Sequence, residues 1–273
     1  MMILHDRRRI RAFLTRNRLL HIYEIGDLGA FFWPKTIWFG LGSESGKPAR
    51  SGDNSVDSLE EIALLYCGSD LPALLAFSHT GPEHLVILLR SLQPFLPVSF
   101  YLHVTPGAEV AFTQDYSCKY HGRHLKMGLT GDLRSGPKTS DIRRLHRRDL
   151  PAILELYKVS YPGNWFDPRM IETGYYVGCW SGETLIAIAG VHTVSRRERV
   201  AALGNITTHP DFRGRGHGRA VTDTLCRRLR EAGFDIGLNV LAANHTAIRI
   251  YESLGFTIVT PYDEWMISST ATT

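Results

Sequence analysis

One short segment, residues 207–219, constrains this chain more than any other part of its sequence. An apolar stretch that is typical of a strand runs into a loop with glycines at positions 214, 216 and 218, and an amphipathic helical pattern follows directly. The first turn of a helix leaves backbone N–H groups unpaired, and the helix dipole makes this end positive. Because glycines let the backbone approach an anion closely, the segment predicts a phosphate-binding loop.

Three arginines in the same segment strengthen this interpretation. Arg213, Arg215 and Arg219 add positive charge and bidentate hydrogen-bond donors. The dinucleotide-binding fingerprint is the main alternative, but it requires glycines in the order G-x-G-x-x-G within an early βαβ unit. Here the glycines alternate and no such unit surrounds them. A glycine-rich turn with incidental arginines is the simpler structural alternative.

A second glycine-containing stretch, residues 42–57, is predicted to be a surface loop. It contains Gly46 and Lys47, which are reminiscent of a nucleotide-binding P-loop. However, Leu41 stands where that motif needs its first glycine, and Pro48 stands where it needs serine or threonine. The P-loop hypothesis is therefore rejected.

Length and composition indicate a globular protein of two domains. The 273 residues suffice for two domains of about 130 residues each. No apolar run reaches the roughly 18 residues that a membrane span needs, and the N-terminus lacks the pattern of a secretory signal. The net charge of +4 is explained by a basic loop for a phosphorylated ligand, so no nucleic acid is expected. We expect a cytoplasmic protein with free thiols at its scattered cysteines, Cys67, Cys118, Cys179 and Cys226.

Two clusters of polar residues have simpler explanations than binding. The spacing of Cys118, His121 and His124 has a passing similarity to metal-ligand spacing, but a fourth ligand is missing and lysines and arginines flank it. We therefore predict no metal site. The arginines of residues 7–18 fit the solvent face of a helix better than a nucleic-acid or membrane arm.

The first half of the chain is predicted to contain a mixture of helices and strands with its own core. Asp6 is expected to cap the first helix, and a cap near Thr80 precedes a later one. The polar stretch 130–139 is the best candidate for a linker, which gives domains of residues 1–135 and 136–273. The predicted helices are a short one after Asp6, 19–28 and 83–93, and the predicted strands are 36–41, 62–67, 73–77 and 98–104.

The second half is predicted to follow the order α-β-β-β-α-β-α-β. Asp149 is expected to cap the first of these helices. The predicted helices are 150–160, 216–232 and 244–254, and the predicted strands are 175–180, 185–194, 199–208, 236–241 and 256–260.

At this point two motifs resemble one family. Residues 213–218, R-G-R-G-H-G, resemble the Q/R-x-x-G-x-G/A motif of the GNAT superfamily of N-acetyltransferases. Residues 244–256, N-H-T-A-I-R-I-Y-E-S-L-G-F, are similar to its N-x-x-A-x-x-x-Y-x-x-x-G-F segment. The resemblance covers residues 141–267, and residues 13–28 more weakly resemble the start of two-part members. It implies an α/β GNAT fold, a mixed central sheet flanked by helices, with an N-terminal α/β domain that is a degenerate GNAT half.

The resemblance also implies a site for acetyl-CoA. The pyrophosphate would lie on the glycine loop, and the pantetheine arm would pair with the strand before it, where that strand parts from residues 236–241. A backbone N–H near Ile206 would hold the thioester carbonyl oxygen. The implied cofactor-binding residues are Asn205, Ile206, Thr207, Thr208, Arg213, Gly214, Arg215, Gly216, His217, Gly218, Arg219 and Asn244.

Tyr251 matches the tyrosine that protonates the departing thiolate in this family. A phenol within reach can neutralise a thiolate whose parent thiol has a pKa near ~8.5. The alternative is that Tyr251 is one of the core-facing side chains of its helix.

The general base is less clearly implied. Histone-acetylating relatives have a glutamate at a position that matches Ala202 here, so this chain departs from the histone-type pattern. His192 is the first candidate, because imidazole titrates near neutrality, although a strand histidine is often structural. Glu264 and Asp167 are weaker candidates, and a base acting through water stays open.

The predicted activity is transfer of an acetyl group from acetyl-CoA to a primary amine of a small molecule, amino acid or peptide, by direct attack in a ternary complex. The aromatic-rich segment 161–166 is expected to line the acceptor pocket, with ordinary packing as its alternative. A monomer would suffice if the N-terminal half takes the place of a partner subunit. Two alternatives stay open, an acyl-CoA-binding regulatory module without turnover and a transferase for a longer acyl group.

Overall fold

The computed structural model describes residues 1–42, 59–133 and 141–270, and its contacts divide them into two compact units. The N-terminal unit comprises Met1–Lys126, Leu241–Ala243 and Thr260–Thr273, and the C-terminal unit comprises Met127–Val240 and Asn244–Val259. The predicted loop 42–57 lies outside the described residues except for Gly42. Most of the predicted linker and the predicted boundary at 135/136 also lie outside them, so that boundary stays a prediction.

Two short helices open the N-terminal unit as predicted. Helix α1 (Arg7–Leu14) begins after Asp6, whose Oδ1 accepts a hydrogen bond from the Arg8 backbone N–H at 2.8 Å. This satisfies one of the unpaired donors of the first turn. Ile10, Phe13 and Leu14 are buried on one face. Helix α2 (Ile22–Asp27) follows and is shorter than predicted.

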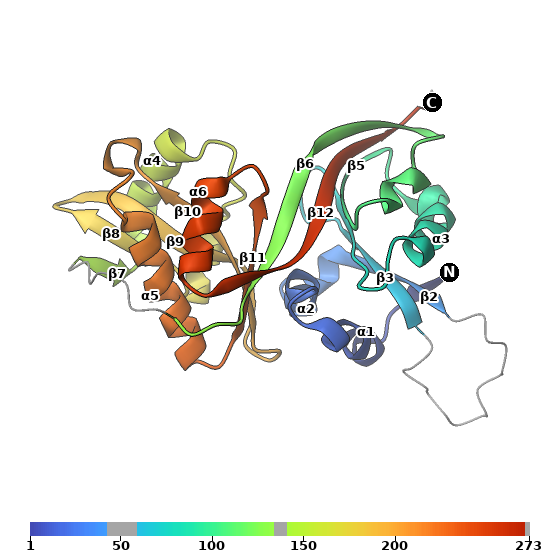
Figure 1. Cartoon of the computed structure of the whole chain (residues 1–273), viewed down its shortest axis with the longest axis horizontal. Helices are drawn as coiled ribbons and strands as arrows, with labels where there is room; N and C mark the ends of the chain where they lie inside the picture. Colours follow the sequence, from blue (N-terminus) through green and yellow to red (C-terminus); the bar gives the residue numbers. More distant parts are fainter. Residues whose placement is uncertain (43–58, 134–140, 271–273) are drawn as a thin grey trace. The chain divides into compact units, whose positions relative to one another are not determined.

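The sheet of the N-terminal unit has the strand order β1-β2-β3-β4-β5-β12-β6. Helix α3 (Glu83–Leu92) lies against this sheet (Figure 1). Its four buried leucines belong to a continuous apolar core with residues such as Phe39 and Phe100. The strands are β1 (Met2–Leu4), β2 (Thr36–Gly42), β3 (Leu59–Tyr66), β4 (Ala73–Ala76), β5 (Ser99–Val104), β6 (Tyr116–Leu129) and β12 (Phe256–Ser269), of which β1 and β6 were not predicted.

The predicted cap near Thr80 is wrong. Pro82 occupies the N-cap position of α3 and makes no side-chain capping bond. The Thr80 hydroxyl lies instead near the buried Glu61 carboxylate, at 3.4 Å from Oε1. A buried carboxylate needs donors, and this need outweighs the local capping preference.

The C-terminal unit has the strand order β7-β8-β9-β10-β11 and the predicted succession of helices and strands. Helices α4 and α5 both pack against β9 (Figure 1). Asp149 does not cap α4 with its side chain; its carboxylate accepts a hydrogen bond from the His146 N–H at 2.7 Å. The elements are β7 (Ile142–Arg144), α4 (Leu150–Ser160), β8 (Val177–Ser181), β9 (Thr184–Ser195), β10 (Val200–Thr208), α5 (His217–Glu231), β11 (Asp235–Leu241) and α6 (His245–Ser253).

The two units repeat one topology. In the N-terminal unit three antiparallel strands, β2, β3 and β4, are followed by α3 and by β5, which pairs parallel to β4. In the C-terminal unit β8, β9 and β10 are antiparallel and are followed by α5 and by β11, which pairs parallel to β10. This correspondence agrees with the expectation that the N-terminal half is a degenerate copy.

The copies differ at the strand-to-helix loop. Residues 77–82 before α3 contain no lysine or arginine, and Glu83 stands in the first turn of α3. A carboxylate at the positive end of a helix competes with an anionic ligand. The N-terminal copy therefore lacks the features of a phosphate loop.

Among residues 1–42, 59–133 and 141–270, no helix is both long and apolar enough to cross a membrane.

Candidate active site

Strands β10 and β11 part in the middle of the C-terminal sheet. Their parallel pairing runs from Val200↔Asp235 to Leu203↔Leu238, while β10 itself continues to Thr208. Beyond Leu203 the edge of β10 that faced β11 has no strand partner in this pairing. A strand edge offers a row of backbone donors and acceptors to an extended ligand, as an added strand would use them. Residues 205–208, predicted to bind the pantetheine arm, form this segment.

A β-bulge interrupts β10 where it leaves β11. Gly204 pairs with Gly190 on β9, and the next pair is Thr207 with Ile188, so β10 has one residue more than β9 in this interval. Asn205 has a positive φ of 54° within the bulge. Bulges reorient backbone and side chains and are frequent beside active sites.

Asn205 is held by two tyrosines. Its side chain is 2% exposed, and Nδ2 donates to the Tyr176 hydroxyl oxygen at 3.0 Å. The Tyr157 hydroxyl donates to the Asn205 carbonyl oxygen at 2.8 Å. The Asn205 side chain is therefore used in a buried hydrogen bond inside the unit, and a cofactor contact at this position would use the backbone.

The glycine loop has the backbone conformation that its glycines predict. Gly214 and Gly216 have φ values of 74° and 83°, and a Cβ at either position would meet nothing within 4 Å. Their role is therefore conformational. Gly218 differs, because its Cβ would lie 3.0 Å from Oγ1 of Thr208. Side chains at 214 and 216 would strain the loop, whereas one at 218 would crowd β10.

Helix α5 presents unpaired amides at this loop. Gly216 is its N-cap and makes no side-chain capping bond, and the first intrahelical bond from this cap runs from the Ala220 N–H to the Gly216 carbonyl at 3.0 Å. The amides of His217, Gly218 and Arg219 precede this bond and belong to the first turn. This arrangement suits an anion such as a pyrophosphate.

The three arginines also hold the loop in place. Nε of Arg213 donates to the Thr208 carbonyl at 3.2 Å, and its Nη2 donates to the Ser160 carbonyl at 3.3 Å. Nε of Arg219 donates to Ser253 Oγ at 3.1 Å, and the Arg215 guanidinium lies over the Phe212 ring. Because a guanidinium carries five N–H donors, these contacts leave donors for a phosphate.

His217 and Asn244 occupy helix starts. Nδ1 of His217 lies 3.8 Å from the Cys179 sulfur, which places its ring beside β8. Asn244 caps α6, with Oδ1 accepting from the Ala247 N–H at 3.1 Å, and its residue is exposed. Capping explains the asparagine structurally and leaves its Nδ2 group for the predicted cofactor contact.

Tyr251 lies on α6 in surroundings that keep its phenol protonated. Desolvation by its surroundings raises its pKa above the ordinary value, and the neighbouring Tyr161 and Cys226 act in the same direction. Its ring packs against Phe256 at 5.8 Å between centroids. A phenol that stays protonated at neutral pH is suited to donate a proton, and Tyr161 belongs to the predicted acceptor segment.

His192 lies at a second bulge, on β9. Thr193 pairs with Ala202 and Val191 pairs with Leu203, so His192 is the extra residue. Its ring lies against Gly204, where a Cβ would come within 1.8 Å of the ring carbon Cδ2. Burial lowers the pKa of His192 to about 4, so the ring is neutral at pH 7. The position of the histone-type glutamate is occupied by Ala202, which is completely buried.

The two carboxylates predicted as weaker bases belong to different units. Asp167 in the C-terminal unit accepts hydrogen bonds from the backbone N–H and Nε of Arg169, at 2.8 and 3.0 Å. Glu264 belongs to the N-terminal unit, where it contacts Tyr262 and two histidines.

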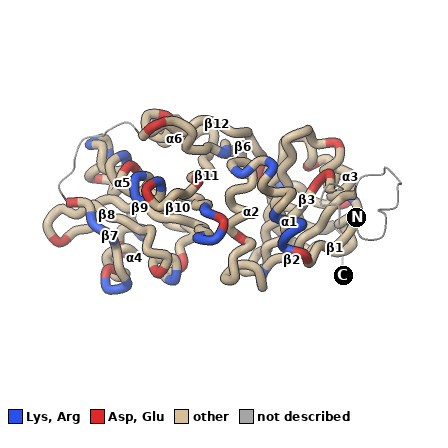
Figure 2. Tube along the Cα trace, turned by 90° about the horizontal axis from the view of Figure 1, so that it is seen from below, with Lys and Arg blue, Asp and Glu red and all other residues tan. Residues whose placement is uncertain are grey.

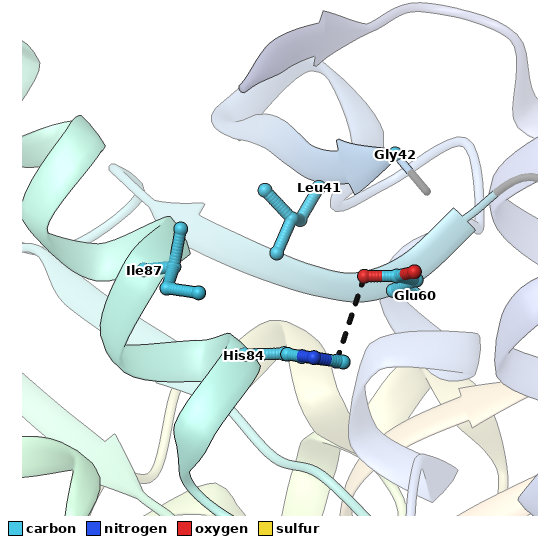
Figure 3. Close-up of a pocket in the computed structure, with 5 residues that line it drawn as sticks. All are labelled: Leu41, Gly42, Glu60, His84 and Ile87. Carbon is cyan, nitrogen blue, oxygen red and sulfur yellow. Dashed lines mark ion pairs between the residues drawn. The ribbon is translucent and has the colours of Figure 1, made fainter. Parts of the chain in front are cut away.

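One surface pocket lies in the N-terminal unit and contains none of the predicted site residues. Figure 3 shows Nδ1 of His84 facing Oε2 of Glu60 at 3.5 Å, with two apolar side chains beside them. The side chain of His84 is exposed and that of Glu60 is partly exposed. The pocket is lined by Leu41, Gly42, Glu60, His84 and Ile87.

The sequence of the C-terminal half decides the family. Residues 140–256 match the model of the acetyltransferase (GNAT) family. This segment is a GNAT acetyltransferase domain. The match contains both the glycine loop and the Asn244–Tyr251 segment, so the expected membership is confirmed.

Two curated acetyltransferases are similar to part of this chain. An uncharacterized N-acetyltransferase of Methanocaldococcus jannaschii is 31% identical over 139 residues, which are 44% of this chain and 61% of the relative. A mycothiol acetyltransferase of Propionibacterium freudenreichii is 34% identical over 101 residues, which are 35% of this chain and 30% of the relative. The chain thus spans less than two thirds of the length of either.

A solved structure extends the comparison to nearly the whole chain. A GNAT-family acetyltransferase from Colwellia psychrerythraea aligns with 98% of this chain and 100% of its own, with a TM-score of 0.56 and 13% identity. This likeness concerns the fold alone and confirms the expected α/β GNAT fold, with a mixed sheet flanked by helices.

Two functional-site residues escaped the sequence analysis. Tyr157 and Tyr176 hold the bulge at Asn205 from positions 48 and 29 residues away. Tyr157 lies on the buried face of α4 together with Ile153 and Leu156. A polar group at the end of such a face was the one signal that it has a partner in the core.

Proposed function

We propose that this protein is an N-acetyltransferase that uses acetyl-CoA and acetylates a primary amine of a small molecule, amino acid or peptide. The observation that carries the proposal is the glycine loop at the start of α5, directly after the segment of β10 that has left β11. One feature fits the pyrophosphate and the other fits an extended pantetheine arm. Their succession along residues 205–219 fits a ligand that contains both in sequence.

The proposed roles follow the geometry of the C-terminal unit. Residues 205–208 would bind the pantetheine arm through their backbone, with the Ile206 N–H facing the thioester carbonyl oxygen. Residues 213–219 would bind the pyrophosphate, and Asn244 would contact the arm through its free amide group. When bound, acetyl-CoA supplies the activated acetyl group.

The proton transfers are assigned to two side chains. The amine nitrogen forms a bond to the acetyl carbon and the carbon–sulfur bond breaks, so the amine loses a proton and the thiolate gains one. Tyr251 would give its proton to the sulfur, and His192, which is neutral at pH 7, would accept the amine proton directly or through water. Binding both reactants together supplies part of the rate by positioning them.

The activity is tested by following thiol release from acetyl-CoA with a panel of primary amines, amino acids and short peptides. The proposed function requires thiol release that depends on an acceptor and an acetylated product of the expected mass. Saturable binding of acetyl-CoA without any such release would favour the regulatory module instead. The same assay with longer acyl donors tests the alternative that the transferred group is not acetyl.

Replacing His192 with alanine should lower kcat/KM by about 100-fold across pH 5–9, because general bases contribute on this order. When the profile is extended below pH 5, the wild-type rate should fall near pH 4, where His192 becomes protonated, and the variant should lack this limb. His79→Ala, the loss of an exposed histidine in the N-terminal unit, serves as control. A pH–rate profile that His192→Ala leaves unshifted would remove this residue from the mechanism.

A further inference from the structure

The peptide group between Asn205 and Ile206 is held by a side chain from another element. Asn205 lies in the β10 bulge with a φ of 54°, a left-handed conformation that asparagine adopts more readily than most residues. Tyr157 comes from α4, which lies on one face of the C-terminal sheet, with α5 on the opposite face (Figure 2). Its hydroxyl donates to the Asn205 carbonyl oxygen at 2.8 Å. This hydrogen bond fixes the direction in which the carbonyl points.

The same hydrogen bond also fixes the N–H of the following residue. The C=O of Asn205 and the N–H of Ile206 belong to one trans peptide group, which is planar, so the two bonds point in nearly opposite directions. Tyr157 therefore determines, through the Asn205 carbonyl, where the Ile206 N–H points. A donor bonded to the carbonyl also polarises the peptide group, which strengthens its N–H as a donor to a further acceptor.

The side chain of Asn205 has a separate anchor, Tyr176. Nδ2 of Asn205 donates to the Tyr176 hydroxyl oxygen at 3.0 Å, and this hydroxyl donates to the Val191 carbonyl on β9 at 3.0 Å. These two bonds hold the asparagine side chain against the neighbouring strand. They do not involve the carbonyl of Asn205, so Tyr157 and Tyr176 act on different parts of the same residue.

This network is shielded from water. Tyr157, Tyr176 and Asn205 are all buried. The Phe166 ring packs against both tyrosine rings, at 5.0 and 5.7 Å between centroids. Burial, reinforced by Tyr176 and Tyr161, raises the pKa of Tyr157 well above its ordinary value, so the phenol keeps its hydrogen at alkaline pH as well. Because water is excluded, the bond from Tyr157 to the carbonyl is stronger than it would be in solvent.

We propose that Tyr157 is a positioning residue of the transferase, which aims the Ile206 N–H at the thioester carbonyl oxygen of acetyl-CoA through the Asn205 carbonyl. This inference rests on the proposed function, which gives the Ile206 N–H that role. A backbone donor stabilises the negative charge that develops on the oxygen when the amine attacks, and it does so best when its direction is fixed in advance. Tyr157 supplies this fixed direction without touching the substrate itself.

The proposal is tested on the full chain with Tyr157→Phe, which keeps the ring and its contact with Phe166. The probe is acetyl-CoA labelled with ¹³C at the acetyl carbonyl, whose band is followed by infrared difference spectroscopy. Binding to the wild type should lower the frequency of this band, because a hydrogen bond polarises the carbonyl, and the variant should return it toward the solution value.

Kinetics and binding of the same variant give a second readout. The kcat of Tyr157→Phe should fall about tenfold, less than the roughly 10²–10³ that removal of an oxyanion donor costs, because the N–H is still present. The dissociation constant of CoA, which has no acetyl carbonyl, should stay within about twofold, because the contact affected is made to the acetyl group.

Tyr176→Phe is the matched control, because it removes a buried hydroxyl bonded to the same asparagine and leaves the bond from Tyr157 in place. Its infrared band should stay near the wild-type position. A loss of the shift that is equal in both variants would show that the network acts only by packing, and it would overturn the proposal. A wild-type band position in a folded Tyr157→Phe variant would overturn it too.

A measurement on the wild type keeps the test valid if Tyr157→Phe is poorly folded. In NMR spectra the Ile206 amide proton should move downfield when acetyl-CoA is added and should move much less with CoA. An Ile206 amide that responds equally to both ligands refutes this inference but leaves the proposed function standing. Absence of any acetyl-CoA binding would instead refute the proposed function, and this inference with it.

Discussion

Replacing Tyr251 with phenylalanine should lower kcat by about 100-fold or more, because general acids contribute on the order of 10²–10⁴ to rate. The dissociation constant of acetyl-CoA should stay within about twofold of the wild-type value, because only the hydroxyl is removed and the ring contact with Phe256 is kept. A tyrosine is protonated at neutral pH with or without the raised pKa, so the role rests on the position of the hydroxyl, and the raised pKa makes this phenol a weaker acid than a free tyrosine. Steady-state kinetics and equilibrium binding separate the two effects.

The control for this prediction is Tyr175→Phe, which removes a hydroxyl elsewhere in the C-terminal unit. Tyr175 packs against Phe234 and lies under the Arg196 guanidinium, so its ring contacts survive the change. Turnover of this variant should stay near that of the wild type. If Tyr251→Phe turns over at the wild-type rate, the tyrosine is a packing residue of its helix, which was the alternative interpretation of the sequence.

The loop at residues 213–219 could be predicted from sequence because its determinants are local. Gly214 and Gly216 are required by positive φ angles, and the helix that follows has an amphipathic pattern of its own. Both signals lie within a few residues of the site. The helix capped by Asp6 was predictable for the same reason, since the cap and its partner Arg8 are two residues apart.

The two bulges could not be predicted, because register depends on residues far away in the sequence. Asn205 lies in the bulge where β10 pairs with β9, about 15 residues earlier in the sequence. Its carbonyl oxygen is held by Tyr157 of helix α4. His192 fits only because residue 204, on the neighbouring strand, has no side chain. A one-residue shift in pairing leaves no trace in the periodicity of either strand. Strand β12 was predicted from its first residues, 256–260, and continues to Ser269.

The capping errors have the opposite cause, a tertiary contact that outweighs a local preference. Thr80 was expected to cap α3, yet its hydroxyl lies near the Glu61 carboxylate. Burial raises the pKa of Glu61 to about 7, although hydrogen bonds from Ser78 and Thr80 act in the opposite direction. Glu61 is on a strand some twenty residues earlier. A rule based on adjacent residues cannot include such a partner.

Replacing Lys126 with methionine should destabilise the protein by about 3–5 kcal/mol, the usual cost of breaking a buried ion pair on one side. Lys126 is 2% exposed, and its ammonium lies 3.8 Å from Glu24 and 3.7 Å from the centre of the Phe77 ring. Burial lowers the pKa of this lysine, and Glu24 opposes that shift by favouring the charged form. Without Lys126, the carboxylate of Glu24 stays buried and faces His21 without a compensating ammonium.

Chemical denaturation of three further variants separates charge from packing. Lys119→Met makes the same substitution at an exposed position of the same strand and should change the stability by less than about 0.5 kcal/mol. Lys126→Met combined with Glu24→Gln should recover most of the loss, because the buried negative charge is then gone while the His21 contact can persist. Glu24→Gln alone should be destabilising, since it leaves the buried Lys126 ammonium without its carboxylate partner. If the double variant were as unstable as Lys126→Met, the aliphatic packing of Lys126, and not its charge, would be what stabilises the unit.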